Sequence, residues 1–396
     1  MKPLVLMIAY ACNPEGGGEH WLGWGWAEQA AKNYSVHLIT TPNARAQVEK
    51  HAPRHGIIPH FVEQPQAGRW GRKIGWQSRV AKFAAELHAR ERFQVVHQTT
   101  FHTFRVPFLA AGLGIPSVWG PVAGGESVPP GFGRDLGSDR YAELGRRLVN
   151  RLWLLHPRIR RSLQQAGAIF VSNRTTLAFL PESVHQKCVI VPPNALRPED
   201  EHFPAPQLRP VADKFELIYV GNCVATRNLP LVFDALRQLN RPEVKLTVVG
   251  AGTALERWKQ IAADLVGAGA VEFTGPVPRE RLPQLYSQAH ALVFPAMRDS
   301  GGSALLEAMA RGVPVICLDW GGPGEMVDAE SGVKIPVTNR VATVSALAAG
   351  IQRLAASPEL RLALARAAHG RARQHFRWES RAQLLVRTYE QVRSKA

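Results

Sequence analysis

Short apolar runs alternate with longer amphipathic stretches along the first half of the chain. Runs rich in Val, Ile and Leu predict strands at 4–9, 36–40, 57–62, 95–98, 117–119 and 168–171. Apolar residues at helical spacing between these runs predict helices that include 22–32, 75–92 and 141–161. Strands that alternate with helices are typical of a parallel sheet. The first half therefore predicts a Rossmann-like α/β domain, residues 1–195.

The alternation breaks at a proline-rich stretch. Pro192-Pro193-Asn194 is followed by four further prolines, at 198, 204, 206 and 210. Proline lacks the backbone N–H that a helix interior or a central strand requires. Residues 196–212 are therefore predicted to be a linker between two domains.

The same alternation then starts again. Strands are predicted at 217–220, 245–249, 271–273, 291–294 and 313–317. Helices are predicted at 229–239, 255–265, 281–289, 303–311, 343–356 and 359–375. This pattern predicts a second doubly wound domain over 213–375, followed by a helix in 376–396. We expect the two domains to face each other across a cleft that takes a ligand.

The loop after the predicted strand 291–294 carries the strongest candidate chemistry. It reads Asp299-Ser-Gly-Gly-Ser-Ala-Leu-Leu-Glu307 and leads into the helix predicted at 303–311. Glycines let a backbone approach a ligand closely, and the N-terminus of a helix favours a diphosphate. The residues expected around that diphosphate are Gly301, Gly302, Ser303 and Ala304. The two carboxylates, one in the loop and one on the helix, are expected to accept hydrogen bonds from the hydroxyls of the same ligand.

This segment resembles the Glu-x7-Glu signature of the family 4 retaining glycosyltransferases, which have the GT-B fold. The resemblance implies that Glu307 holds the ribose of a donor nucleotide and that Asp299 touches the transferred sugar. Asp299 stands where the family usually has Glu, so the carboxylate is kept on a side chain that is one methylene shorter. The sequence from Trp119 to Glu126 resembles bacterial members that build exopolysaccharide or lipopolysaccharide.

Further matches in the second half place more of the donor site by resemblance. Gly221 and Arg227 stand in the first strand–helix turn, where the family reaches the diphosphate, although Asn222 replaces the usual Arg. The remaining positions that the resemblance assigns to the nucleotide are Gly250, Gly252, Thr274 and Val277. The resemblance also implies that the last helix, in 376–396, crosses back to the first domain.

The first half holds the candidates for the acceptor side and for catalysis. Its Gly-rich loop after the first strand contains Gly17 and Gly18, which the resemblance places near the diphosphate. His97 and His102, after the fourth strand, are both candidates to point at the donor sugar, because the family often has a His there. The candidates for holding acceptor hydroxyls are Glu19 and Glu126.

Charge adds one further expectation. The net charge is +16, and residues 1–198 hold 24 Lys and Arg against 12 Asp and Glu. Seven of the ten Trp residues are also in this half, and the predicted helix 141–161 carries six arginines. An anionic membrane surface is therefore a candidate partner, with a solvated basic face as the alternative. Nothing in the sequence is typical of a nucleic-acid-binding protein, so nucleic acid is not expected as a partner.

The remaining composition narrows the chemistry. Four scattered cysteines without a Cys-x-x-Cys pair predict neither a disulfide framework nor a zinc site. No Asp-x-Asp pair favours a bound metal, so we expect no metal and no cofactor beyond a nucleotide-diphosphate sugar. We read the first strand as buried and not as a signal peptide, and no apolar run has the length of a membrane span. The expected location is the cytoplasm, with the inner face of the cell membrane as an option.

These observations together predict a metal-independent retaining glycosyltransferase that passes a sugar from a nucleotide-sugar to a glycan or lipid-linked acceptor. Its expected context is bacterial cell-surface polysaccharide synthesis. A nucleotide-sugar 2-epimerase on the same fold is an alternative, which a product assay without acceptor would reveal. A basic, non-catalytic binding scaffold is a second alternative, which strong salt-dependent binding to oligonucleotides would favour.

Overall fold

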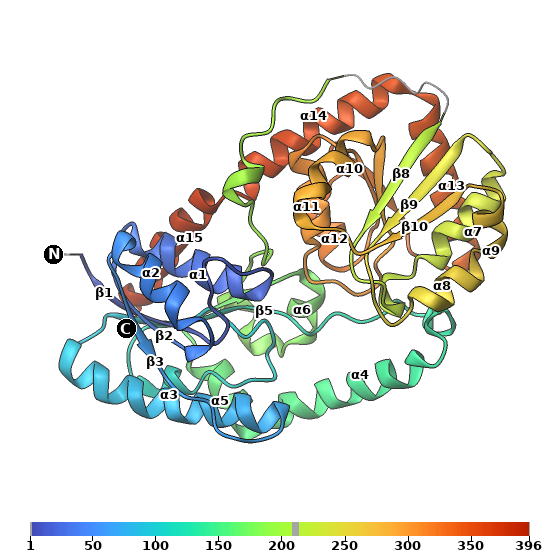
Figure 1. The fold of residues 1–396 in the computed structure, drawn as a ribbon. Helices are drawn as coiled ribbons and strands as arrows, with labels where there is room; N and C mark the ends of the chain where they lie inside the picture. Colours follow the sequence, from blue (N-terminus) through green and yellow to red (C-terminus); the bar gives the residue numbers. More distant parts are fainter. Residues whose placement is uncertain (1, 208–213, 396) are drawn as a thin grey trace. The chain divides into compact units, whose positions relative to one another are not determined.

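The computed structural model describes residues 2–207 and 214–395, and it divides into two compact units. Unit 1 comprises Met1–Gly125, Arg147–Ala195 and Trp378–Ala396, and unit 2 comprises Glu126–Arg146 and Leu196–Arg377. Each unit is built around one parallel sheet (Figure 1). The expected α/β class with two Rossmann-like domains is confirmed, whereas the cleft between them stays a prediction.

The sheet of unit 1 has seven strands in the order β3-β2-β1-β4-β5-β6-β7. Their bounds are β1 Leu4–Ala9, β2 Ser35–Thr40, β3 Ile57–Phe61, β4 Val95–Gln98, β5 Ser117–Val122, β6 Ala168–Val171 and β7 Cys188–Ile190. The helices that belong wholly to this unit are α1 Glu19–Ala31, α2 Arg45–His55, α3 Arg69–Glu91, α5 Pro157–Gln165, α6 Arg174–Phe179 and α15 Trp378–Ser394. Strand β1 pairs with both β2 and β4, so the strand order reverses between β1 and β4.

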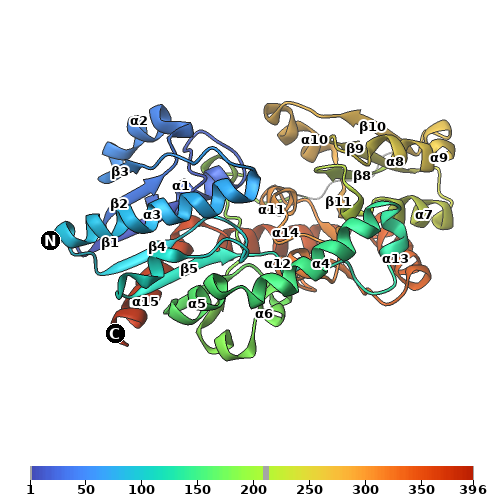
Figure 2. The same cartoon turned by 90° about the horizontal axis from the view of Figure 1, so that it is seen from below.

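Helices cover both faces of this sheet, which explains why β1 is apolar at every position. Val5 and Met7 of β1 pack into one core together with α1 and α15, whereas Leu6 and Ile8 pack into a second core with α3 and α5. Successive side chains of a strand point to opposite faces, so a strand that is covered on both sides buries the side chains of both faces and favours a continuous apolar run. Figure 1 shows α1 and α15 on one side of the strands and α3 on the other, and Figure 2 shows α3 in front of them.

The sheet of unit 2 has six strands in the order β10-β9-β8-β11-β12-β13. Their bounds are β8 Phe215–Val220, β9 Val244–Val249, β10 Val271–Gly275, β11 Ala291–Phe294, β12 Val315–Leu318 and β13 Gly332–Ile335. The helices are α7 Pro230–Leu239, α8 Leu255–Ile261, α9 Ala263–Gly267, α10 Leu282–Gln288, α11 Ser303–Ala310, α12 Gly321–Met326, α13 Arg340–Ala356 and α14 Pro358–His375. Here the strand order reverses between β8 and β11.

The structure corrects the helix predicted at 141–161, which is two helices. Helix α4 is Asp139–Leu155, and α5 begins at Pro157 with His156 as its N-cap. The ring nitrogen Nδ1 of His156 accepts a hydrogen bond from the backbone N–H of Arg158 at 3.2 Å. Proline is favoured in the first turn of a helix because that turn needs no N–H donor, and so Pro157 starts a new helix.

The structure also corrects the predicted extent of the first domain, because residues 126–146 pack with unit 2. Phe132 and Leu136 are buried in the core of unit 2. The amide of Asn228 donates to Asp135 at 3.0 Å, and the indole N–H of Trp320 donates to the carbonyl of Ser127 at 2.8 Å. The residues that this segment contacts are therefore distant in the sequence, and a local pattern of apolar and polar residues cannot predict such contacts.

The expected linker is held against unit 2 where the structure describes it. Asp200 is buried and forms an ion pair with Arg311 at 2.7 Å, and the backbone N–H of Leu196 donates to the carbonyl of Phe376 at 2.7 Å. Residues 208–212 of the predicted linker lie outside the described residues.

Helix α15 packs on α1, where a Cβ at Gly25 would lie 2.2 Å from the ring of Trp378. None of the described helices is long and apolar enough to span a bilayer.

Candidate functional site

The best-supported site lies in unit 2, where the strand order reverses between β8 and β11. In doubly wound sheets, ligands bind outside the carboxyl ends of the strands at such a switch point. The loop after β8 carries Arg227, and the loop after β11 carries Asp299. The two side chains form an ion pair with each other. Arg227 and Asp299, the two catalytic candidates of the second half, are therefore brought together at the switch point. They are 72 residues apart in the chain.

Both members of this pair are positioned by further contacts. The guanidinium of Arg227 lies over the ring of Phe294, 4.9 Å from its centroid. Asp299 Oδ1 accepts a hydrogen bond from the backbone N–H of Gly301 at 2.9 Å. The side chains of Arg227 and Asp299 are 19% and 8% exposed. A diphosphate at this place would contact Arg227 together with Asp299. The ion pair with Asp299 already orients the planar guanidinium of Arg227.

Sequence reasoning missed a second cation at this site, Arg298. Its guanidinium pairs with the buried Glu143 at 2.5 Å and remains 32% exposed. Burial lowers the pKa of Arg227, and the positive charge of Arg298 lowers it further. Arg298 is thus close enough to Arg227 to affect its pKa. It is a second cation near a loop in which Asn222 stands at the position where the sequence resemblance implied an arginine. Its position next to Asp299 could have suggested Arg298 as a site residue. Its contact with Glu143 could not have been predicted, because Glu143 lies 155 residues away in the chain.

The N-terminus of α11 begins in the same loop, with Gly302 as its N-cap. A Cβ at Gly302 would lie 2.8 Å from Leu305 and 3.0 Å from the ring of Phe294. Gly302 therefore serves close packing of the loop on the sheet. The first N–H groups of a helix lack partners within the helix and form its positive end. The N–H groups of Ser303 and Ala304 occupy this first turn, as the sequence predicted.

The glycines of the two neighbouring loops are required by backbone packing. Gly250 and Gly252 have φ angles of 142° and 158°. A Cβ at Gly250 would lie 1.9 Å from the carbonyl oxygen of Gly221, and one at Gly252 would lie 2.3 Å from that of Cys223. The loops after β8 and β9 thus meet backbone to backbone. This contact alone accounts for the glycines, and their predicted role at the nucleotide stays a prediction.

Glu307 lies on α11 and opens onto a hollow of about 220 Å³. Its Oε2 accepts a hydrogen bond from the hydroxyl of Tyr286 at 3.3 Å, and its Oε1 lies 3.7 Å from the guanidinium of Arg279. Burial raises the pKa of the Glu307 carboxyl, and the neighbouring Arg279 partly opposes this shift. The residues that line the hollow are Glu199, Arg279, Glu280, Leu282, Pro283, Glu307 and Arg311. A mostly buried carboxylate that opens onto a hollow of this size suits a pair of ribose hydroxyls.

Thr274 and Val277 belong to the segment at the end of β10. The hydroxyl of Thr274 donates to backbone carbonyls, Val248 at 3.3 Å or Gly275 at 3.0 Å. Val277 is partly buried and packs against the core of unit 2. Arg279, which contacts Glu307, follows directly in the chain. The segment thus adjoins the Glu307 hollow, while the contacts of Thr274 and Val277 with a base stay predictions.

In unit 1 the structure corrects the role of His97. The side chain is fully buried, with Nδ1 at 2.7 Å from the hydroxyl of Tyr389 and Nε2 at 2.9 Å from the carbonyl of Gly120. Burial lowers the pKa of His97 to about 4. Both ring nitrogens are therefore engaged within the core that joins β4 to α15. His97 holds the fold and does not reach a sugar.

Four other candidates lie in the two loops at the switch point of unit 1, between β1 and β4. Glu19 begins α1, and its Oε1 accepts a hydrogen bond from the backbone N–H of His102 at 2.8 Å. Gly18 is the N-cap of α1 with a φ of 55°, and Gly17 precedes it in an exposed position. The imidazole of His102 is partly buried. The loop after β1 and the loop after β4 are thus joined through Glu19.

Glu126 is placed differently from expectation. It belongs to the segment that packs with unit 2, and its side chain is only 5% exposed. Its backbone carbonyl accepts a hydrogen bond from Arg146. This burial leaves little surface for an acceptor hydroxyl, so Glu126 fits a positioning role beside Arg146 and Glu143. Glu126 was expected at the acceptor because the sequence gave no sign that residues 126–146 pack with unit 2.

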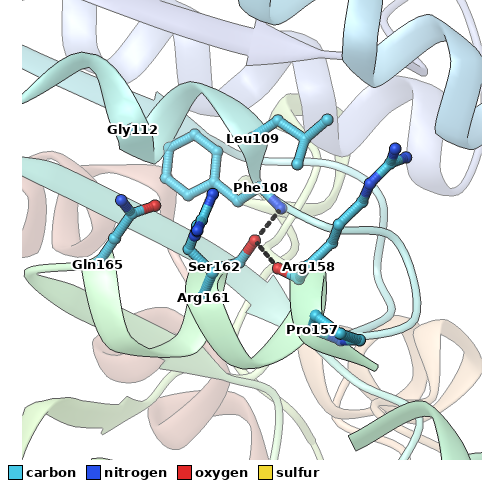
Figure 3. A pocket seen from close by; sticks show the side chains of 8 residues that line it. All are labelled: Phe108, Leu109, Gly112, Pro157, Arg158, Arg161, Ser162 and Gln165. Atoms are coloured by element: carbon cyan, nitrogen blue, oxygen red, sulfur yellow. Dashed lines mark hydrogen bonds between the residues drawn. The ribbon is translucent and has the colours of Figure 1, made fainter. Parts of the chain in front are cut away.

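A second hollow, of about 410 Å³, lies in unit 1 between α5 and the short helix Leu109–Leu113 (Figure 3). Ser162 joins the two elements, because its hydroxyl accepts from the N–H of Phe108 at 3.0 Å and donates to the carbonyl of Arg158 at 2.8 Å. Arg158 and Arg161 line the hollow and make it electropositive. The sequence had marked these arginines without predicting a hollow.

Within residues 2–207 and 214–395, no group of three or more His, Cys, Asp or Glu side chains is arranged to hold a metal ion. The four cysteines are not paired in disulfides, and burial raises the pKa of the Cys223 thiol, which lies near the Arg227 loop, to about 11. Cys223 is therefore a packing residue and not a nucleophile.

A segment of unit 2 is similar to a known family. Residues 201–371 match the family model described as Glycosyl transferases group 1. This group 1 segment contains Arg227, Arg298, Asp299 and Glu307, and it ends within α14.

Curated relatives extend the comparison to about half of the chain. A GDP-mannose-dependent alpha-(1-6)-phosphatidylinositol monomannoside mannosyltransferase from Mycolicibacterium smegmatis is 28% identical over 260 residues, 59% of this chain. The chain spans 66% of the length of that relative, and 45% and 46% of two others.

Two solved structures have the same fold over nearly the whole chain. A glycosyltransferase from Rickettsia africae has a TM-score of 0.67 at 14% identity, with 100% of both chains covered. Anabaena Alr3699/HepE, solved in complex with UDP, has a TM-score of 0.65 at 16% identity, with 98% of this chain and 100% of that one covered. The two parallel-sheet domains of this chain therefore have the GT-B fold.

Proposed function

We propose that this protein is a retaining, metal-independent glycosyltransferase that uses a nucleotide-diphosphate sugar as donor. The observation that carries the proposal is the Arg227–Asp299 pair at the β8/β11 switch point, beside the N-terminus of α11. A leaving diphosphate gains negative charge in the transition state, and fixed positive groups aimed at that charge are the largest single source of catalysis in such reactions. Arg227, Arg298 and the first turn of α11 are such groups.

The proposed mechanism is a front-face displacement. The acceptor hydroxyl would attack the anomeric carbon on the face from which the diphosphate leaves, and the departing phosphate oxygen would take the hydroxyl proton. This course needs no side-chain base, which agrees with the loss of His97 as a candidate. Asp299 would orient Arg227 and meet the donor sugar, and Glu307 would hold the ribose in its hollow.

The group 1 segment and the relatives support a nucleotide-sugar donor. One relative is named for GDP-mannose and one structure of the same fold holds UDP, so either base is a reasonable first choice. For the acceptor we propose a glycan or a lipid-linked glycan in bacterial cell-surface polysaccharide synthesis. The phosphatidylinositol mannoside in the name of that relative is one example of a lipid-linked acceptor.

A thermal-shift panel of UDP-, GDP-, ADP- and dTDP-sugars tests the donor. A ligand present at about 100 times its dissociation constant adds roughly 2.7 kcal/mol to the free energy of unfolding. We expect one nucleotide to stabilise the wild type and to stabilise Arg227→Ala less. If no nucleotide-sugar shifts the unfolding temperature, the donor assignment is wrong.

A product assay without acceptor then separates transfer from epimerisation. A transferase consumes its donor substantially only when an acceptor is added, apart from slow hydrolysis. Formation of the 2-epimeric nucleotide-sugar in the absence of any acceptor, by elimination and re-addition of the nucleoside diphosphate, would instead identify a nucleotide-sugar 2-epimerase on the same fold.

A further inference from the structure

The second half of α4 exposes a row of large apolar side chains. Leu148, Leu152 and Leu155 are 61%, 56% and 66% exposed. They are spaced four and three residues apart, so they share one face of the helix. The same helix also exposes Tyr141 and Leu144, at 65% and 58%. Of the nine large hydrophobic residues of the described chain that are exposed, six belong to α4, the sixth being Val149.

The opposite face of α4 shows why the row faces outward. Asn150 is 1% exposed, and its amide nitrogen donates to the carbonyl of Gly124 at 2.6 Å. Its Oδ1 accepts from Arg105 at 2.6 Å. Trp153 is partly buried and packs near Trp70, with ring centroids 6.2 Å apart. These contacts fix the rotation of the helix, so the leucines cannot turn inward.

A surface helix ordinarily turns its leucines toward the core and its polar residues to water. Here a polar amide is buried and hydrogen-bonded while three leucines are exposed. A contiguous exposed apolar surface of this kind marks a contact with an apolar partner. We call Leu148, Leu152 and Leu155 together the α4 apolar row.

The charge around the row identifies the partner. Residues 144–181 contain seven arginines and no Asp or Glu. Arg151 lies within the span of the row, and Arg158, Arg160 and Arg161 follow on α5; all four are exposed. Figure 3 shows Arg158 and Arg161 at the hollow on α5. Apolar residues flanked by arginines are the composition of a helix that lies in the interface of an anionic bilayer.

We propose that the α4 apolar row inserts into the surface of an anionic lipid bilayer, with the arginines of α4 and α5 contacting lipid headgroups. A second copy of the chain is the competing occupant. Packing two such rows together would bring two sets of arginines close to each other without acids to neutralise them, whereas an anionic bilayer supplies the opposite charge.

Sedimentation with vesicles tests the proposal on the full-length protein. We expect binding to vesicles of phosphatidylcholine with about one third phosphatidylglycerol and little binding to phosphatidylcholine alone. The variant Leu148→Gln/Leu152→Gln/Leu155→Gln should lower the partition coefficient at least about tenfold for each leucine replaced. Glutamine has a helix propensity close to that of leucine, so α4 should stay helical.

The matched control replaces three exposed apolar residues elsewhere, in Ile58→Gln/Val266→Gln/Val341→Gln. This variant should bind vesicles like the wild type. Arg158→Gln/Arg160→Gln/Arg161→Gln should weaken binding roughly fivefold for each charge removed, and added salt should weaken the wild type. Donor-induced thermal shifts should be the same in all three variants, which separates this proposal from that of the function.

Three outcomes would overturn the proposal. The wild type could fail to bind anionic vesicles, or the leucine variant could bind as tightly as the wild type. The wild type could also be a dimer in sedimentation velocity that the leucine substitutions dissociate, in which case the row is an interface between two copies.

Discussion

The sheet of unit 1 reverses its strand order between β1 and β4, and that of unit 2 reverses between β8 and β11. In unit 2 the two loops at this point are joined by two oppositely charged side chains, Arg227 and Asp299, and a helix N-terminus lies beside them. In unit 1 they are joined by the carboxylate of Glu19 and a backbone N–H. The same topology thus joins its two loops through a side-chain ion pair in unit 2 and through a carboxylate and a backbone N–H in unit 1.

This difference shows which polar residues are available for chemistry. In unit 2, Arg298 remains 32% exposed beside the pair, and Glu307 opens onto a hollow. In unit 1, His97 of β4 is enclosed in the core, with both ring nitrogens engaged. A switch point therefore predicts where a ligand can bind, while the charges at its loops indicate whether that ligand is a diphosphate.

Removing the cation of unit 2 should have the largest effect. Arg227→Ala should lower turnover at saturating donor by about 10²–10³-fold, because the charge of the leaving diphosphate grows toward the transition state. Steady-state kinetics with the donor found by thermal shift measure this. Arg237→Ala is a matched control, because Arg237 also pairs with aspartates in unit 2, Asp234 and Asp264, but on the surface. Full turnover in Arg227→Ala would show that the cation comes from elsewhere.

The buried histidine of unit 1 should reveal itself in the pH dependence of stability. Burial lowers the pKa of His97 to about 4, while an unfolded histidine titrates near 6.5. Between these values the unfolded state binds more protons, so the free energy of unfolding should fall by about 3 kcal/mol as pH drops from roughly 6.5 to 4. Above pH 6.5 His97 contributes no slope.

Urea unfolding at several pH values measures this dependence. His97→Gln should remove most of the slope that His97 causes, whereas the exposed control His375→Gln should leave the slope unchanged. Identical slopes in wild type and His97→Gln would show that His97 can be protonated in the folded protein. It would then return as a candidate for catalysis.

These two sites also show how far the sequence alone could reach. Strands 4–9, 95–98, 168–171 and 291–294 were predicted with the bounds that the structure has, because each is a short apolar run covered on both faces. The acid–glycine loop 299–307 was predicted at the carboxyl end of β11 for the same reason. Local periodicity thus sufficed for the sheets and for one side of the site.

What could not be predicted depends on long-range packing. His97 was a reasonable candidate until its partner Tyr389, 292 residues away, was known. Arg298 gained meaning only through Glu143, on a segment that leaves the first domain. Strands β7 and β13 were missed because β7 has only three residues and β13 begins with a glycine and contains Lys334, so neither forms an apolar run of four. Pro157, in contrast, was a readable signal for a second helix.

Glu307 should affect the donor through binding. Glu307→Gln should weaken nucleotide affinity by about 1.5–3 kcal/mol, because the ribose would lose a charged acceptor. The pKa of Glu307 is raised by burial, so the wild type should also bind more weakly as pH falls toward that pKa. Calorimetry at about pH 7.5 and about pH 5.5 measures both effects. Glu280 lines the same hollow, so Glu280→Gln is the control. Equal affinities in the wild type, Glu307→Gln and Glu280→Gln would refute the ribose assignment.

The smallest expected effect concerns Glu19, on which unit 1 depends to join its two loops. Glu19→Ala removes the acceptor for the N–H of His102 and an acid from the first turn of α1. We expect the free energy of unfolding to fall by about 1–2 kcal/mol, with donor affinity in unit 2 unchanged. Urea unfolding and calorimetry measure the two quantities, with the exposed Glu86→Ala of α3 as control. If stability is unchanged while transfer to the acceptor is lost, Glu19 contacts the acceptor, and the switch point of unit 1 is a binding site after all.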